Sequence, residues 1–429
     1  MKRDKIVYGA LLCGVVLLCN SCMLGRRQIK SPELELPATV VAGATDSLTM
    51  ADMAWWSVYS DSTLTALIER TLERNKDMLA ASARVRRMRA LGRVARADQL
   101  PSVSGQLAAD TEHNDYEGEP ASDDPEFDAK VSLAWELDLW GNLRWANRKA
   151  VAEYLATVDA QRALQMTLVA EVATAYYELV ALDQELSIVR RTLQTRKEGV
   201  RQARLRFEGG LTSETALQQA KVELASTATL IPGLESRIAL KEHQIALLAG
   251  AYPTLRIDRQ TMEMHARLPE RLKVGLPSEL LKRRPDLRQS EQTLRAAEAA
   301  MGSLVSPLFS FGKKKAKYKA ALAACDEARL NYEQKVLAAF REVNDAVVTY
   351  RNVRTAAALK RDLQQAAQKY VELAQLQYFN GVINYLDVLD AQRKYFDAQI
   401  GLSNAVRDEH LAMVDLYKAL GGGWGVERE

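Results

Sequence analysis

The longest regular pattern in this chain is a row of apolar residues between positions 144 and 207, recurring at alternating intervals of four and three. The row is Leu168, Val172, Ala175, Leu179, Leu182, Leu186, Val189 and Leu193. A period of 3.5 residues predicts an α-helix that winds left-handedly around a partner helix. At 1.5 Å per residue, a helix over the whole range spans about 95 Å. The pattern therefore predicts a long coiled-coil rod, which few globular domains contain.

Glycines mark the end of this rod. Gly209 and Gly210 follow its last periodic residues, and glycine suits the left-handed backbone position that ends many helices. Ser213 is a residue type preferred at a helix N-cap, which predicts a returning helix up to Leu248. The segment as a whole therefore predicts a helical hairpin.

The hairpin pattern occurs a second time, 171 positions later, as the offset between Gly210 and Gly381 shows (381 − 210). Gly381 ends a second rod over residues 315–378, and Asn384 is placed to cap a second returning helix up to Leu420. Such a duplication predicts a repeated architecture. We expect repeat 1 over residues 61–250, a linker over 251–276 and repeat 2 over 277–424.

The second repeat is shorter than the first. Leu72 and Asp77 match Leu281 and Asp286 at an offset of 209, whereas later residues match at 171. The difference of 38 residues (209 − 171) falls between Asp286 and Gly312. We therefore expect the second repeat to lack most of what the first repeat holds in the equivalent stretch.

That stretch of the first repeat carries the β-strand signals, in a predicted β-hairpin over residues 101–139. Residues 102–109 follow a proline, and residues 131–139 alternate between apolar and polar side chains without error. Such a strand fits a half-buried strand of a soluble sheet, or a strand between lipid and water, for which about 9–11 residues suffice. The scarcity of other strand signals favours the second interpretation. The intervening residues 110–128, with nine Asp or Glu and no Lys or Arg, predict a solvated loop.

Helices dominate the rest of the pattern. A helical tract over residues 62–98 precedes the strands, and residues 84–93 within it are densely basic. The chain has only 11 prolines, and its long tracts of Ala, Leu, Gln, Arg and Glu favour helices. The predicted fold class is therefore mainly α with a small membrane β part, built on tandem-duplicated coiled-coil hairpins.

The N-terminus has the pattern of an export signal. A positively charged start precedes an apolar stretch over residues 6–18, which is too short to span a bilayer comfortably. Ser21 before Cys22 then fits a bacterial lipoprotein signal, in which residues 1–21 are removed and Cys22 is acylated. An ordinary signal peptide with incidental cysteines is the alternative. Residues 22–60 are expected to form an extended arm.

Residues that could carry out catalysis or bind a cofactor show no organised pattern. Lys plus Arg number 58 and Asp plus Glu 55, so a net charge of +3 gives no dedicated nucleic-acid surface. The four histidines lie far apart, at no metal-ligand spacing, and Gly312-Lys313 lacks the rest of a phosphate-binding loop. After the signal, no segment reaches eighteen consecutive apolar residues, so no transmembrane helix is expected. We expect no enzyme activity and no cofactor or metal.

Three phrases make the chain resemble the TolC family of outer membrane factors, and within it the lipoprotein branch that serves resistance-nodulation-division efflux pumps. They are residues 276–288 (LPSELLKRRPDLR), 135–141 (WELDLWG) and 381–392 (GVINYLDVLDAQ). The likeness extends over residues 55–424 and also includes the doubled rods and the lipoprotein signal.

The resemblance implies a homotrimeric exit duct of a tripartite efflux system that exports small molecules from the periplasm. Each chain would give four helical rods to a periplasmic tunnel and four strands to a shared outer membrane barrel. The implied partners are a periplasmic membrane-fusion adaptor, an inner-membrane pump of the resistance-nodulation-division type, and outer membrane lipid. The second β-hairpin is truncated near residues 303–311, so another segment replaces the missing strand or the chain does not conduct.

The resemblance also places two sites on the hairpin tips, residues 206–213 and 377–384. The implied adaptor-docking residues are Arg206, Gly209, Gly210, Leu211, Gly381 and Val382. Leu386 and Asp390 match a leucine and an aspartate that ring the periplasmic gate. Three Asp390 carboxylates brought together would repel one another, raise their pKa values and attract cations. An ordinary aspartate on a helix face is the alternative.

Two other functions fit parts of the sequence. One is a lipid-anchored periplasmic coiled-coil scaffold or adaptor without a pore, although such a protein has no use for a lipid-facing strand over residues 131–139. The other is the outer membrane component of a type I secretion system. The lipoprotein signal favours small-molecule efflux over secretion.

Overall fold

The structure is a computed structural model that describes residues 37, 39, 61–114, 117, 122–139, 141–259, 277–302 and 313–424. All of them belong to the larger of two compact units, Leu36–Glu429. The predicted signal segment and Cys22 lie outside the described residues, as do almost all of the predicted arm and the residues near 303–311. Most of the predicted linker, residues 260–276, lies outside them too.

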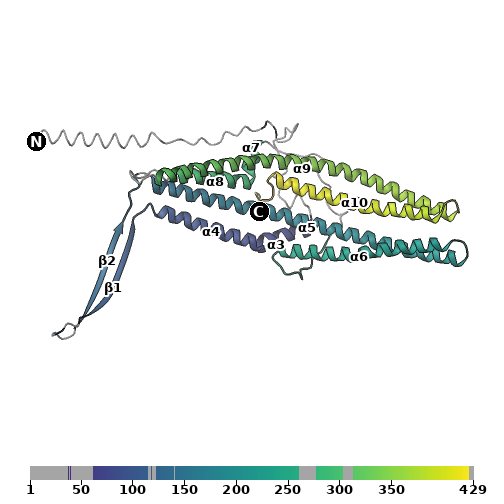
Figure 1. Cartoon of the computed structure of the whole chain (residues 1–429), viewed down its shortest axis with the longest axis horizontal. Helices are drawn as coiled ribbons and strands as arrows, with labels where there is room; N and C mark the ends of the chain where they lie inside the picture. Colours follow the sequence, from purple (N-terminus) through teal and green to yellow (C-terminus); the bar gives the residue numbers. More distant parts are fainter. Residues whose placement is uncertain are drawn as a thin grey trace. The chain divides into compact units, whose positions relative to one another are not determined.

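The described residues form helices and one pair of strands (Figure 1). The first repeat contains α3 (Ser62–Arg74), α4 (Lys76–Ala97), β1 (Ser102–Asn114), β2 (Ser122–Ala134), α5 (Asn142–Glu208) and α6 (Glu214–Leu248). The second contains α7 (Pro277–Arg283), α8 (Pro285–Gly302), α9 (Lys313–Phe379) and α10 (Tyr385–Ala419).

The helices repeat with the offset read from the sequence. The rods α5 and α9 have 67 residues each, and their starts differ by 171 (313 − 142). The returning helices α6 and α10 have 35 residues each and start at the same offset (385 − 214). The helices α4 and α8 start 209 residues apart (285 − 76). The two repeats therefore share one arrangement of helices, although the second is 38 residues shorter between α8 and α9 (209 − 171).

The prediction of one helical tract over residues 62–98 was wrong at Asn75, where the backbone leaves the helical region between α3 and α4. The Asn75 side chain accepts hydrogen bonds from the backbone N–H groups of Asp77 and Met78, at 2.9 and 3.1 Å. Its amide group also donates to the carbonyl oxygen of Leu248, at 3.0 Å. The break therefore depends on a contact with the distant end of α6.

The strand bounds predicted from the sequence also need correction. Strands β1 and β2 pair in an antiparallel register that joins Ser102 to Ala134 and continues to Asn114 and Ser122. Ladder hydrogen bonds extend the strands into the acidic segment that was predicted to be a loop. Beyond Ala134, residues 135–138 leave the strand, because they have no partner across the register.

The two faces of this β-hairpin differ sharply. One face carries large apolar side chains that are between 70% and 87% exposed: Val103, Leu107, Phe127, Val131 and Leu133. The other face carries serine, glutamine, lysine and carboxylate side chains, and the hydroxyl groups of Ser104 and Ser132 lie 3.1 Å apart on it. The alternation predicted from the sequence is thus present, and it leaves an apolar face without a protein partner among the described residues.

The main core lies where α5 is surrounded by α3, α6 and α10. Val172, Tyr176 and Leu179 of α5 are completely buried in it, together with Leu64 of α3 and Ile245 of α6. A second core joins α7, α9 and α10 around Val343, Tyr350 and Leu416. These cores place the two helical hairpins, α5–α6 and α9–α10, side by side with their tips at the same end (Figure 1). Among the described residues, no helix is both long and apolar enough to cross a membrane.

Candidate functional site: the paired helical tips

The first tip is closed by hydrogen bonds between backbone groups. After α5 ends, the N–H of Leu211 donates to the carbonyl oxygen of Arg206 at 2.8 Å, and the N–H of Gly210 donates to that of Phe207 at 2.9 Å. This pair of bonds defines a Schellman motif and requires a left-handed residue. Gly210 supplies it, with φ of +71°. The predicted role of this glycine in ending the rod is confirmed.

The second tip repeats this turn. The N–H of Val382 donates to the carbonyl oxygen of Gln377 at 2.9 Å, and the N–H of Gly381 donates to that of Tyr378 at 3.0 Å. Gly381 has φ of +74°. Leu211 and Val382 follow the two glycines and are 71% and 69% exposed. Each tip therefore presents an apolar side chain on a fixed turn.

Aromatic contacts join the two tips. The guanidinium carbon of Arg206 lies 4.6 Å from the centre of the Tyr378 ring, a cation–π contact between α5 and α9. The Tyr378 ring lies 5.4 Å from that of Tyr385, at the start of α10. Tyr385 also packs against the small core of the first tip, around Ala203 and Leu217. Burial raises the pKa of Tyr385, so its hydroxyl stays neutral at this contact.

An ion network links the returning helices above the tips. Arg196 of α5 is 8% exposed, and its guanidinium lies 3.0 Å from the Glu223 carboxylate of α6. It also donates to the Glu223 carbonyl oxygen at 2.8 Å and to the Thr227 hydroxyl. Arg393 of α10 donates to the other carboxylate oxygen of Glu223 at 2.7 Å. Burial lowers the pKa of Arg196, which Glu223 counteracts.

Sequence reasoning missed this network. At the offset of 171, Lys394 of the second repeat occupies the position equivalent to Glu223 of the first. A reversal of charge at equivalent positions of two repeats signals that the repeats have diverged there. That signal could have pointed to Glu223, but it does not identify Arg196 or Arg393 as its partners.

The predicted gate residues lie on the exposed face of α10. Leu386 is 52% exposed, and Asp390 follows one turn later. The Asp390 carboxylate lies 2.8 Å from the Lys394 ammonium and accepts a hydrogen bond from the Tyr370 hydroxyl at 3.5 Å. The hydrogen bond from Lys394 holds the pKa of Asp390 below its ordinary value. In a single chain, the pKa of Asp390 is therefore lowered, whereas we expect it to be raised where three such carboxylates meet.

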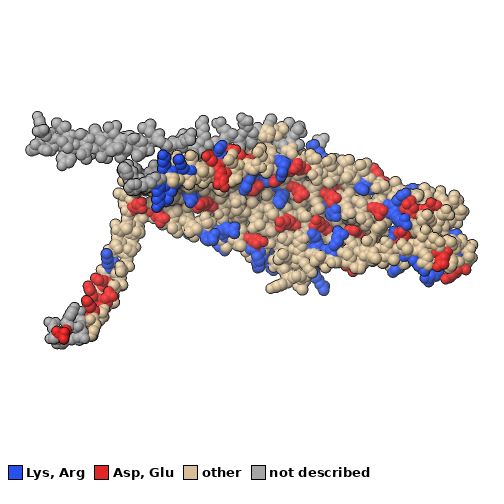
Figure 2. All heavy atoms as spheres, in the orientation of Figure 1, with Lys and Arg blue, Asp and Glu red and all other residues tan. Residues whose placement is uncertain are grey.

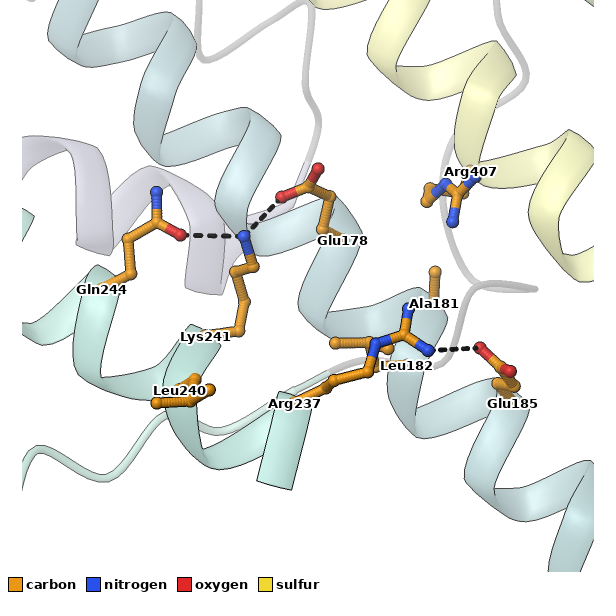
Figure 3. A pocket seen from close by; sticks show the side chains of 9 residues that line it. All are labelled: Glu178, Ala181, Leu182, Glu185, Arg237, Leu240, Lys241, Gln244 and Arg407. Carbon is orange, nitrogen blue, oxygen red and sulfur yellow. Dashed lines mark hydrogen bonds and ion pairs between the residues drawn. The ribbon is translucent and has the colours of Figure 1, made fainter. Parts of the chain in front are cut away.

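A hollow of about 310 Å³ lies farther from the tips, between α5, α6 and α10 (Figure 3). Four of its charged groups form two ion pairs with one another. The Lys241 ammonium lies 2.7 Å from the Glu178 carboxylate, and the Arg237 guanidinium lies 3.8 Å from that of Glu185. Arg407 of α10 also lines the hollow and pairs with Asp408 outside it. No cluster of His, Cys, Asp and Glu in the described part of the chain could hold a metal ion.

Comparison with known proteins agrees with this arrangement. The outer membrane efflux protein family matches residues 67–251 and 302–422. The solvent efflux pump outer membrane protein SrpC of Pseudomonas putida is 30% identical over 413 residues, covering 86% of this chain and 87% of that protein. The cation efflux system protein CusC of Escherichia coli O6:H1 is 27% identical over 452 residues, covering 96% and 97%.

Solved structures give the same result. The outer-membrane channel OprN superposes with a TM-score of 0.80 at 26% identity, covering 92% of this chain and 99% of that one. A crystal structure of CusC superposes with a TM-score of 0.78 at 25% identity, covering 92% and 100%.

The doubled helical hairpins and the amphipathic strand pair are those of a chain that superposes on outer membrane channels over most of its length. The chain belongs to the outer membrane efflux protein family. It is an outer membrane channel of the TolC type that serves as an exit duct for efflux.

Proposed function

We propose that three copies of this chain form the duct, together with a periplasmic adaptor and an inner-membrane pump of the resistance-nodulation-division type. The observation that carries this proposal is the pair of equivalent tips, tied together by Arg206 and Tyr378. Two tips joined by such a contact can lie together or apart. A partner that binds one of these arrangements better shifts the equilibrium towards it. The exported molecules would be small, and the relatives named for solvent and cation efflux leave their chemical class open.

The trimer is supported by apolar side chains that the single chain leaves exposed. Leu91 and Val94 of α4 are 50% and 56% exposed, and Leu337 and Leu359 of α9 are 66% and 63% exposed. Long rods that expose such rows need neighbouring helices to cover them. Neighbouring copies would supply those helices. The native mass of the full-length protein extracted from outer membranes tests this, because a monomer would contradict the proposal.

The tips would dock the adaptor. Leu211 and Val382 offer exposed apolar contacts, while Gly210 and Gly381 fix the turns that present them. Arg206 and Gly209 belong to the first of these turns. Replacing Leu211 and Val382 together by Asp would abolish co-purification of the adaptor and efflux in cells. Normal efflux by a correctly inserted double variant would contradict this role.

Leu386 and Asp390 would form the gate at the periplasmic end. Leu386 is 52% exposed and the Asp390 side chain 44% exposed in one chain, so both can face the same residues of two other copies. Each Asp390 brings its own Lys394, which reduces the repulsion between three carboxylates. Cysteine introduced at Leu386 should form disulfide links between copies in the closed state. Failure to cross-link in a trimer of native mass would exclude this position from the gate.

The membrane anchor would be a lipid on Cys22, after removal of residues 1–21. The sequence motif supports this proposal. Metabolic labelling with a radioactive fatty acid, compared between the natural chain and Cys22→Ala, tests it. Equal labelling of the two chains would show that Cys22 is not acylated.

A further inference from the structure

Three arginines line one side of a groove between α4 and α5. Arg89, Arg93 and Arg96 follow intervals of four and three along α4, so they share one helix face. Asn147 and Tyr154 line the groove from α5. The hollow between the helices has a volume of about 510 Å³, which is within the range of sites for small ligands.

These three guanidinium groups are exposed. Within the residues that the structure describes, no hydrogen bond or ion pair joins them to another side chain. Other exposed arginines, such as Arg190 and Arg201, are paired with carboxylates. Three neighbouring cations without a counter-charge repel one another. They therefore favour an anion with several oxygen atoms, which guanidinium groups bind through parallel hydrogen bonds.

The groove is open at its base as well as charged at its rim. Gly92 lies between the arginines on α4, and a Cβ atom placed there would meet nothing within 4 Å. Val151 of α5 lines the same hollow and is 44% exposed, which adds an apolar surface. Asn147 and Tyr154 add groups that can donate neutral hydrogen bonds. The groove thus suits a ligand with an anionic head and an apolar part.

The position of the groove along the chain indicates where such a ligand comes from. Arg96 precedes the first residue of β1 by six positions, and β1 and β2 carry the exposed apolar face. Exposed lysines also occur at the start of α9, at Lys313, Lys315, Lys317 and Lys319. Figure 2 shows basic side chains gathered there and along α4. Basic clusters next to membrane-inserted segments attract anionic lipid headgroups.

We propose that the α4–α5 groove binds the phosphate of an anionic phospholipid headgroup through Arg89, Arg93 and Arg96. The lipid fixes the end of the helical rods at the membrane surface. This role is separate from the gate and the adaptor: the groove shares α5 with the first tip, but its residues Asn147 and Tyr154 lie near the start of that helix, whereas the tip lies at its end.

Native mass spectrometry of the full-length protein in neutral detergent tests the proposal, with phosphatidylglycerol and phosphatidylcholine added in turn. We expect phosphatidylglycerol to be retained and phosphatidylcholine to be lost. The triple variant R89Q/R93Q/R96Q should retain less phosphatidylglycerol than the natural chain, by a factor of about ten or more, since each basic residue near the surface contributes to the attraction. Gly92→Glu should also weaken retention, although less, because its carboxylate would offset one of the three positive charges and repel the phosphate.

A matched control removes the same charge elsewhere. The control variant R190Q/R295Q/R341Q replaces three exposed arginines that form ion pairs on other parts of the helices, so it should retain lipid normally. Equal retention by the groove variant and the natural chain would overturn the proposal. So would equally tight binding of inorganic phosphate, which would make the ligand a soluble anion. Loss of the trimer in the groove variant, with lipid retention unchanged per chain, would show that the arginines contact a neighbouring copy instead.

Discussion

The Arg393 guanidinium on α10 lies 2.7 Å from the Glu223 carboxylate on α6, so an ion pair joins the two helical hairpins of the chain. The same carboxylate holds the buried guanidinium of Arg196 on α5. The Glu223 side chain is only 13% exposed. It pairs with one buried cation, Arg196, and with one partly exposed cation, Arg393. Separation of the hairpins must break the exposed contact, while the buried contact stays within the first hairpin.

Arg393→Gln should make the duct easier to open. The side chain is 49% exposed, so its removal should cost less than about 1 kcal/mol of stability. A change of about 1 kcal/mol still shifts an equilibrium between closed and open forms by about fivefold. We expect a higher open probability of the full-length protein in planar bilayers. Arg190→Gln, which breaks a comparable pair within the first hairpin, should leave the open probability unchanged. Equal effects of the two variants would contradict a link between hairpins.

Glu223→Gln should lower stability rather than only change gating. It leaves the Arg196 guanidinium buried without its carboxylate, and breaking a buried pair in this way costs about 3 kcal/mol or more. We expect a lower midpoint of thermal unfolding in detergent. Glu235→Gln removes an exposed carboxylate, 51% accessible, from the same helix and should change the midpoint little. If both variants unfold at the natural midpoint, the buried network does not stabilise the hairpin.

Gly210→Ala and Gly381→Ala should each destabilise a tip by about 1 kcal/mol, because an L side chain disfavours the left-handed backbone that both positions adopt. No neighbouring atom lies within 4 Å of the new Cβ, so the effect would be conformational and not a clash. Gly233→Ala is the matched control: it also meets nothing within 4 Å, but lies inside α6 and should stabilise by about 0.5–1 kcal/mol. Backbone hydrogen exchange, which is faster where a segment is destabilised and slower where it is stabilised, distinguishes the tip variants from the control. Slower exchange at the tips in either tip variant would contradict the assigned turn.

Lys394→Met should increase the preference of the duct for cations. Lys394 lowers the pKa of Asp390 from its ordinary value of 3.8, so Asp390 stays ionised and paired as pH falls toward that value. The ion pair contributes above the unfolded pKa of Asp390 and is lost as pH falls through the lower folded value. Without Lys394, three unpaired carboxylates would attract cations more strongly and would titrate at higher pH. Reversal potentials measured at pH 7 and pH 5 should show this, and Asp390→Asn should remove the difference. An unchanged reversal potential in Lys394→Met would place Asp390 away from the ion path.

Val131→Asp should prevent insertion into the outer membrane. Val131 lies on the apolar face of the β-hairpin and is 80% exposed. A charge on a face in contact with lipid is destabilising, by about 2–4 kcal/mol for a lysine or arginine at the bilayer centre and by less for an aspartate. Ser132→Asp places the same charge on the polar face, one residue along the strand, and should insert normally. The amount of each variant in purified outer membranes is the measurement. Equal insertion would mean that the apolar face does not contact lipid.

The sequence by itself determined the features that depend on local interactions. The 3.5-residue period predicted the first rod, and the glycines at 210 and 381 predicted both turns, because helix periodicity and left-handed caps involve residues only a few positions apart. The offset of 171 predicted matching helices, and the bounds of α5 and α9 repeat at that offset.

The tertiary structure decided the features that need segments distant in the sequence. The break at Asn75 depends on a hydrogen bond to Leu248, and the length of the strands depends on the register between β1 and β2. The pairing of Glu223 with Arg393 depends on α6 and α10 lying side by side, 170 residues apart in the chain. No local pattern encodes these contacts, because a charged residue on a helix surface is compatible with many partners until packing selects one.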